Sequence, residues 1–213
     1  MDHLLNEEQF PAGFLPAWFE ARRRHALEQA EQLPEPSRHM ESWRFGAPGN
    51  ESLEHVEAAP PADPETLAPI IRERASMSEA LRIVYANGIP VSIPEELPEG
   101  LSVMDMEDFV LQCPDTARKY LETETETLGS EKLSALATAL QHNGLVIMAD
   151  RKISLPLEIL HFISGDNVAV FPSTLLIAET GSRLRILERH ISADHGRQFC
   201  GALQQYHLSS ASS

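Results

Sequence analysis

The sequence is short of cysteine, of basic residues and of long apolar runs, and each shortage excludes a class of protein. Its 213 residues include two cysteines, Cys113 and Cys200, which stand far apart without a C-x-x-C companion. Neither a disulfide framework nor a zinc site is implied. No window approaches the roughly 18 apolar residues of a membrane span, and the start MDHLLNEEQF lacks the features of a secretion signal. We expect a cytoplasmic protein.

Basic side chains are outnumbered by acidic ones. The chain has 17 Lys and Arg against 32 Asp and Glu, a formal net charge of −15. This sign repels phosphate backbones and anionic lipid surfaces at long range. The 42% of hydrophobic residues is enough for a real core, so we expect a globular protein without a nucleic-acid or membrane partner.

The usual signatures of catalysis are missing too. The sequence has no P-loop, no G-x-G-x-x-G, no G-x-S-x-G and no H-E-x-x-H. Its acidic run ETETETLGSE alternates glutamate with threonine, which is more typical of a solvated surface than of a general acid and base. We therefore predict no catalysis by this chain alone.

Helices are expected mainly in the first part of the chain. The first begins near Pro16, ends before Pro34, and presents one apolar face made of Phe19, Ala26, Ala30 and Leu33. The triple arginine at 22–24 is interpreted as a solvated face of this helix. A short helix opens with Asp63 and Pro64, and another is capped by Ser130 and ends at Asn143-Gly144.

Two further features are expected before residue 128. Asn87-Gly88 between two alternating apolar runs predicts a hairpin with a type I′ turn. Residues 46–62, rich in Pro, Gly and Glu, predict an irregular and mobile connector. Trp43 and Phe45 are expected to anchor its start to a neighbouring surface, with ligand stacking as the alternative for Trp43.

From Leu145 onwards short apolar strands follow one another, separated by tight polar turns. The runs are LVIMAD, LEILHFI, VAVF, TLLIA, LRILERHI and LQQYHL. They leave no room for the crossover helices that normally cover a parallel sheet. A β-solenoid buries such strands without helices, and a sandwich or small barrel is the alternative.

Several motifs occur in the order found in one known family. A helix and strand, EKLSALATALQHNGLVIMAD, precede the strand at 156–161, and the turn at Gly181 precedes the strand at 186–192. Upstream, Glu41 to Phe45 (ESWRF) follows an N-terminal helix, and the Asn87-Gly88 hairpin comes next. In these features the chain resembles the SufB/SufD family of iron–sulfur cluster assembly proteins, and SufD more than SufB.

The resemblance implies an α+β fold in two regions. Residues 1–128 would form an N-terminal helical and small α+β region, and residues 129–213 the first coils of a truncated right-handed parallel β-helix. It also implies a non-catalytic scaffold subunit whose partners are SufB-like and SufC-like (ATPase) subunits. The family's C-terminal helical region, which docks SufC, is missing before Ser213, so the chain is expected to be a fragment or a split form.

The resemblance supplies no catalytic, cofactor-binding or metal-binding residue, because the family's cysteines and histidines that handle sulfur and iron lie in the missing part. The cluster is expected to be handled by the complex. Cys113 and Cys200 are interpreted as structural thiols. No metal site is predicted from the histidines of the strand region, because His190 and His195 should not share a strand face. Those histidines are His161, His190, His195 and His207. A cupin-like metal-binding β-domain or enzyme remains the alternative.

The C-terminal segment GALQQYHLSSASS has no helix to cap a terminal strand. An uncapped strand offers unpaired backbone groups. We expect it to pair with the same edge of a second copy, giving a two-fold dimer that a proline at Leu203 would block.

Overall fold

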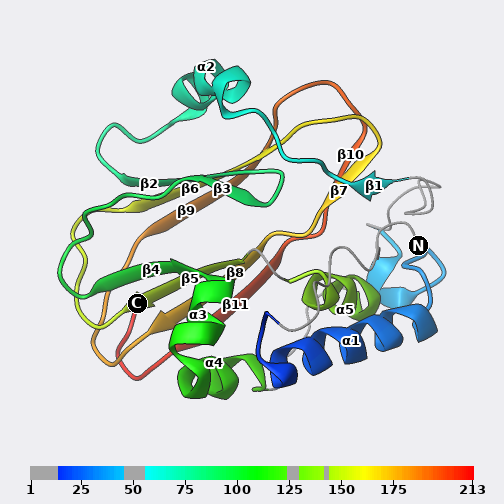
Figure 1. Cartoon of the computed structure of the whole chain (residues 1–213), viewed down its shortest axis with the longest axis horizontal. Helices are drawn as coiled ribbons and strands as arrows, with labels where there is room; N and C mark the ends of the chain where they lie inside the picture. The colour runs from blue at the N-terminus through cyan, green and yellow to red at the C-terminus, as the bar shows by residue number, and fades with distance from the viewer. Residues whose placement is uncertain (1–13, 46–55, 124–129, 142–143) are drawn as a thin grey trace.

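The computed structural model describes residues 14–45, 56–123, 130–141 and 144–213 (Figure 1). Its helices are α1 (Ala17–Gln32), α2 (Pro64–Arg74), α3 (Met106–Gln112), α4 (Pro114–Leu121) and α5 (Glu131–Ala139), with a 3-10 turn at Glu41–Trp43. Its strands are β1 (Glu57–Ala58), β2 (Leu81–Ala86), β3 (Ile89–Ser92), β4 (Leu101–Asp105), β5 (Gly144–Ala149), β6 (Leu157–Ile163), β7 (Val168–Val170), β8 (Ser173–Ala178), β9 (Ile186–Ser192), β10 (Gln198–Cys200) and β11 (Leu203–Leu208).

The strands form three sheets. Sheet I has the order β3-β2-β6-β9, sheet II the order β11-β8-β5-β4, and sheet III the order β1-β7-β10. From β5 onwards the chain visits sheets II, I and III in turn, so β8 pairs in parallel with β5, β9 with β6, and β10 with β7. The six strands expected from Leu145 onwards are therefore confirmed. In each of these parallel pairs, the second strand is the third one after the first along the chain.

The fold is α+β, but the expectation of a right-handed parallel β-helix is wrong. In the part of the chain that the structure describes, the three sheets are separate, and none is closed or forms a solenoid. Sheets I and II are mixed, because β3 runs antiparallel to β2 and β4 antiparallel to β5. The tight turn after β2 and the helices between β4 and β5 reverse the chain direction, and sequence patterns of single strands do not reveal such pairings. The division at residue 128 stays a prediction, and strands from both sides of it share each sheet.

The hairpin between β2 and β3 is confirmed. Asn87 and Gly88 have φ angles of 49° and 80°, which are the positive values that a type I′ turn needs. The Asn87 side chain has a further role, because its amide donates to the Pro60 carbonyl at 2.7 Å and accepts from the Ser164 N–H at 2.9 Å. The turn is thereby fixed to two other segments.

The helix starts are also confirmed. Asp63 accepts a hydrogen bond from the Glu65 N–H, and Ser130 accepts one from the Leu133 N–H, so both act as N-caps. The helix after Ser130 ends at Ala139, earlier than expected. Asn143, the expected stop, lies outside the described residues, and Gly144 opens β5.

Helix α1 differs from expectation at its arginines. Arg22 is half-buried and Arg23 is buried: the Arg22 Nε donates to the Leu121 carbonyl and the Arg23 Nε to the Ala139 carbonyl, each at 3.0 Å. These carbonyls belong to the last residues of α4 and α5. Only Arg24 is exposed as expected, pairing with Glu20 at 3.4 Å.

A lysine on α5 completes this arrangement. Lys132, near the start of α5, donates from its Nζ to the Leu33 carbonyl at the end of α1 at 2.9 Å. The start of each helix thus lies near the end of the other, so the two helices run antiparallel. Carbonyls without an intrahelical partner are satisfied at both ends of the pair.

The expected connector is partly ordered in a sheet. Val56 is buried, and β1, which follows it, pairs in parallel with β7 in sheet III. Residues 46–55 lie outside the described part of the chain. Trp43 is half-buried, whereas Phe45 is 91% exposed, so the anchoring role expected of Phe45 is wrong.

Sheets I and II enclose the main core, with helices on their outer faces (Figure 1). The inner cluster contains Ile83, Leu145, Ile147, Leu157 and Ile159. On the outer face of sheet I, α2 packs on Val84, Leu160 and Phe162. On the outer face of sheet II, α1, α3 and α4 pack on Val146, Leu175 and Ile177. Each of these sheets is thus covered by helices on its outer face and by the other sheet on its inner face. Because β5 and β6 are buried on both faces, their sequences are almost continuously apolar.

Candidate functional site

The inner face of sheet I changes from apolar to polar along its strands. Alternate residues of a strand share one face, so the inward rows are Leu81-Ile83-Tyr85 on β2, Leu157-Ile159-His161 on β6 and Ile186-Glu188-His190 on β9. Each row begins in the hydrophobic core and ends in a residue that carries a polar group. Parallel register places these polar ends side by side.

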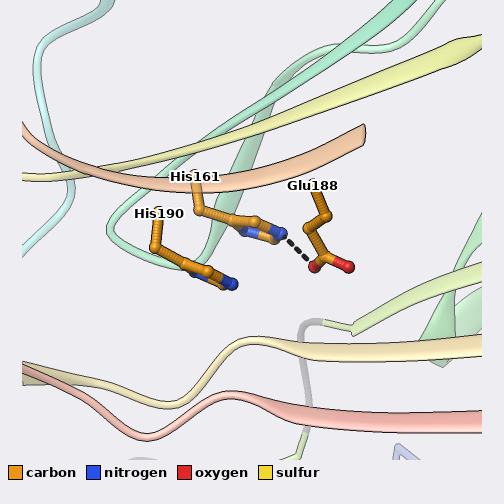
Figure 2. Close-up of side chains that lie close together, drawn as sticks. All are labelled: His161, Glu188 and His190. Atoms are coloured by element: carbon orange, nitrogen blue, oxygen red, sulfur yellow. Dashed lines mark hydrogen bonds and ion pairs between the residues drawn. The ribbon is translucent and has the colours of Figure 1, made fainter. Parts of the chain in front are cut away.

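Three of these residues form a cluster, hereafter the His–Glu–His cluster: His161, Glu188 and His190. His161 on β6 lies directly opposite His190 on β9, and the two rings stack with centroids 4.7 Å apart and planes 9° apart. His161 Nε2 lies 2.9 Å from Glu188 Oε1. Figure 2 shows both imidazoles and the carboxylate projecting on the same side of sheet I.

Sheet II fixes the carboxylate of this cluster. The Thr174 hydroxyl on β8 donates to Glu188 Oε1 at 2.9 Å, and the Gln204 amide on β11 donates to Oε2 at 2.7 Å. Burial alone would raise the pKa of Glu188, but the hydrogen bonds and charges of His161 and its other neighbours outweigh burial and lower it. Glu188 is therefore an anion at neutral pH.

Sheet III contributes a thiol. Cys200 on β10 places its Sγ 3.5 Å from His190 Nδ1. Burial, partly offset by a backbone hydrogen bond from Ala202, raises the pKa of the Cys200 thiol to about 11. Partial burial and, to a lesser extent, the charge of His161 lower the pKa of His190, which favours the neutral imidazole at neutral pH. Residues from all three sheets thus meet at one place.

Two buried polar atoms at this place have no hydrogen-bond partner among the described residues. They are His161 Nδ1 and the Tyr85 hydroxyl. The Tyr85 ring lies 5.3 Å from the His161 ring, and burial followed by the charge of Asp105 raises the pKa of the Tyr85 hydroxyl. Buried polar groups are nearly always satisfied, so unpaired ones call for an explanation.

The other residues considered from the sequence lie elsewhere. Cys113 is half-buried between α3 and α4, and His195 is exposed between β9 and β10. His207 on β11 packs its ring on Tyr120 at 4.9 Å. Most of the acidic run at 122–131 lies outside the described residues.

Sequence reasoning missed Glu188 and the approach of His161 to His190. The two-residue spacing of Glu188 and His190 was a usable signal, because it places both on one strand face. The partner strand of β9 could not be identified from its own sequence, so the position of His161 opposite His190 could not be predicted.

Away from the cluster, a hollow of about 1050 Å³ lies between α1, α5 and β11. Its described lining mixes apolar side chains with polar ones such as Arg22, Gln29 and Glu131, and includes no histidine or cysteine. It offers no set of ligands or acid–base groups comparable to the His–Glu–His cluster. The cluster is therefore the stronger candidate for a site.

Fold and site together define an α+β protein whose three sheets converge on two histidines, a glutamate and a thiol. The chain is similar to the iron–sulfur cluster assembly protein SufD of Bacillus subtilis (strain 168), with 25% identity over 187 residues. The match covers 83% of this chain and 42% of the relative, so the chain spans less than half the length of the curated relative it matches. The resemblance inferred from the sequence motifs is thereby confirmed. No protein-family model matches the chain.

None of the helices that the structure describes is long and apolar enough to cross a membrane.

Proposed function

We propose that the chain is a SufD-like scaffold component of iron–sulfur cluster assembly, acts in the cytoplasm and is not an enzyme by itself. The observation that carries this proposal is the similarity to SufD over 83% of the chain. The order of the ESWRF segment, the Asn87-Gly88 hairpin and the strand at 156–161 supports it. The cupin-like alternative has less support, because cupins are antiparallel jelly rolls and β6 pairs in parallel with both of its neighbours.

The partners of this component are a SufB-like subunit and a SufC-like ATPase. The edges of the sheets favour a large partner surface, since β9, β10 and β11 are each the outermost strand of their sheet. Outermost strands present unpaired N–H and C=O groups, to which a partner strand can add. The three edges belong to β9, β10 and β11, which follow one another along the chain.

The experiment is co-expression of the 213-residue chain with SufB-like and SufC-like proteins from the same genome, with an affinity tag on the SufB-like subunit. The expected result is that all three proteins elute together from the affinity column and from gel filtration. Tagged SufB-like protein that retains the ATPase but not this chain would contradict the proposal.

Without partners, β11 is also the proposed edge for a homodimer. The Leu203 N–H donates to the carbonyl of Pro172, the residue before β8, at 2.8 Å, so a proline at position 203 would disturb the pairing of β11 with β8. Along a strand, N–H groups point alternately to either side, and the Tyr206 N–H is expected to face away from β8. Tyr206→Pro should therefore abolish the dimer, whereas Tyr206→Phe should retain it.

Sedimentation across a concentration series measures this dimer. The charge of −15 opposes association, but screening limits repulsion to about 8 Å at physiological ionic strength. A chain that stays monomeric at all concentrations, or a dimer that persists in Tyr206→Pro, would contradict edge pairing.

A further inference from the structure

We propose that the His–Glu–His cluster and Cys200 form a binding site for one divalent transition-metal ion of the zinc and ferrous-iron class. One ligand atom from each of the three cluster residues lies within 4.8 Å of the others. The Cys200 Sγ lies beside this group, 3.5 Å from His190 Nδ1. This proposal does not rest on the proposed function, because it uses only the geometry of the chain.

The donor set selects the class of metal. Two imidazoles, one carboxylate and one thiol combine nitrogen, oxygen and sulfur ligands. Zn²⁺ and Fe²⁺ accept such mixed sets, whereas Mg²⁺ and Ca²⁺ require oxygen ligands throughout. An all-oxygen ion would leave three of the four donors unused.

The separations in the cluster and between His190 and Cys200 can be compared with those around a tetrahedral ion. Metal–nitrogen and metal–sulfur bonds of about 2.05 and 2.3 Å at a tetrahedral angle place nitrogen and sulfur about 3.6 Å apart. His190 Nδ1 and Cys200 Sγ are 3.5 Å apart. The ligand atoms of the cluster lie within 4.8 Å of one another, so side-chain movement on the order of 1 Å brings them to a similar spacing.

The unpaired nitrogen of His161 is an independent observation. His161 is 4% exposed, and its Nδ1 has no partner among the described residues while its Nε2 contacts Glu188. In the neutral ring with the proton on Nε2, Nδ1 carries a lone pair and has no contact with water. A metal ion bound to Nδ1 would give this nitrogen a partner, whereas an ion bound to Nε2 would replace its contact with Glu188.

The side chains around the cluster already hold one of the proposed ligands, Glu188, in a fixed orientation. Thr174 and Gln204 hold the two carboxylate oxygens of Glu188 from sheet II, and ligands of bound metals are commonly oriented by such outer hydrogen bonds. His190 is the exposed member, on the outermost strand of sheet I, and gives an ion access from that edge.

The test titrates the metal-free 213-residue chain with Co²⁺ and Zn²⁺. The expected result is one ion per chain, with a thiolate-to-cobalt charge-transfer band and the intense visible absorption of four-coordinate cobalt. His190→Gln should weaken Zn²⁺ binding by about tenfold or more, and Cys200→Ser should abolish the charge-transfer band. The matched controls His207→Gln and Cys113→Ser, at a histidine and a cysteine outside the cluster, should leave affinity and spectrum unchanged.

Circular dichroism of each metal-free variant shows whether it is folded, and Glu188→Gln provides a second change within the cluster if His190→Gln unfolds. A chain that takes up no stoichiometric Zn²⁺ or Co²⁺ would overturn the proposal. So would binding that survives both the His190 and Cys200 changes, or that is weakened equally by His207→Gln.

Discussion

At the scale of single residues, whether a charged side chain is buried depends on hydrogen-bond partners that lie far from it in the sequence. Arg22 and Arg23 sit in a run typical of a solvated helix face, yet Arg23 is 1% exposed and its guanidinium contacts the end of α5. Burial lowers the pKa of both arginines to about 10, which leaves them charged at neutral pH. Hydrogen bonds to helix-end carbonyls offset part of the desolvation cost.

Replacing Arg23 by methionine tests this role. The substitution keeps an apolar stem but removes the donor to the Ala139 carbonyl, so we expect the free energy of unfolding to fall by about 2 kcal/mol. Arg24→Met, at an exposed position of the same helix, should change it by less than about 0.5 kcal/mol. Urea denaturation measures both values, and equal effects would contradict the buried role of Arg23.

Asp105 makes a pH-dependent contribution. Burial, with added repulsion from Glu107 and Asp108, raises the pKa of this carboxyl to about 6, although the Glu107 N–H donates to it. The folded state then binds a proton more readily than the unfolded state, so this group's contribution to stability falls as pH rises from about 4 to 6.

The variant Asp105→Asn isolates that contribution, because asparagine is an equally good N-cap for α3. Near neutral pH the variant should be more stable than the unchanged chain by about 1 kcal/mol, and the difference should shrink toward pH 4. Thermal melts across this range provide the comparison. A difference independent of pH would show that Asp105 does not titrate as described.

At the scale of elements, the buried carboxylate of Glu158 joins the segment after α2 to sheet I and forms an ion pair with Arg82 inside that sheet. Glu158 on β6 is fully buried and accepts from the Ser76 N–H, the Ser76 hydroxyl and the Arg82 Nε at 2.7–2.8 Å. Burial opposes ionisation, but the bonds from Ser76 and Arg82 outweigh it and lower the pKa of Glu158. The stability from this pair is thus present at neutral pH and lost in acid.

Removing the cation should leave a buried and incompletely compensated carboxylate. We expect Arg82→Met to lower the free energy of unfolding by about 3 kcal/mol. Arg151→Met removes an arginine whose ion pairs with Glu99 and Asp150 are exposed, and should cost less than about 1 kcal/mol. Chemical denaturation at neutral pH measures the free energy of unfolding of both variants. A similar decrease in the two would contradict a larger contribution from the buried ion pair.

Local features of the elements were predictable because their causes are local. The Asn87-Gly88 turn and the Ser130 cap depend on backbone angles and on hydrogen bonds within three residues. The pairing of β6 with β9, and hence the stacking of His161 on His190, depends on contacts between separate strands. Residue types alone did not determine those contacts, so the cluster could not be predicted.

At the scale of the whole molecule, the strand content and the α+β class followed from the sequence, but the arrangement of sheets did not. The expected β-helix assigned all of the stacking strands to residues after 128. The structure instead pairs β1, β2 and β4 from the earlier part with β7, β6 and β5, two of these pairs in parallel and one antiparallel. Strand direction is fixed by connections and by covering helices, which the pattern of individual strands does not reveal.

The central claim is that this chain serves iron–sulfur cluster assembly, and the most direct measurement is made in the organism that encodes it. The gene is deleted and the specific activity of an enzyme that carries an iron–sulfur cluster is compared with that of an enzyme without one. The account predicts that the cluster enzyme loses activity, that its protein level persists without cluster, and that the restored gene reverses the loss. Equal activity of the cluster enzyme with and without the gene, under iron limitation as well as in rich medium, would contradict the account.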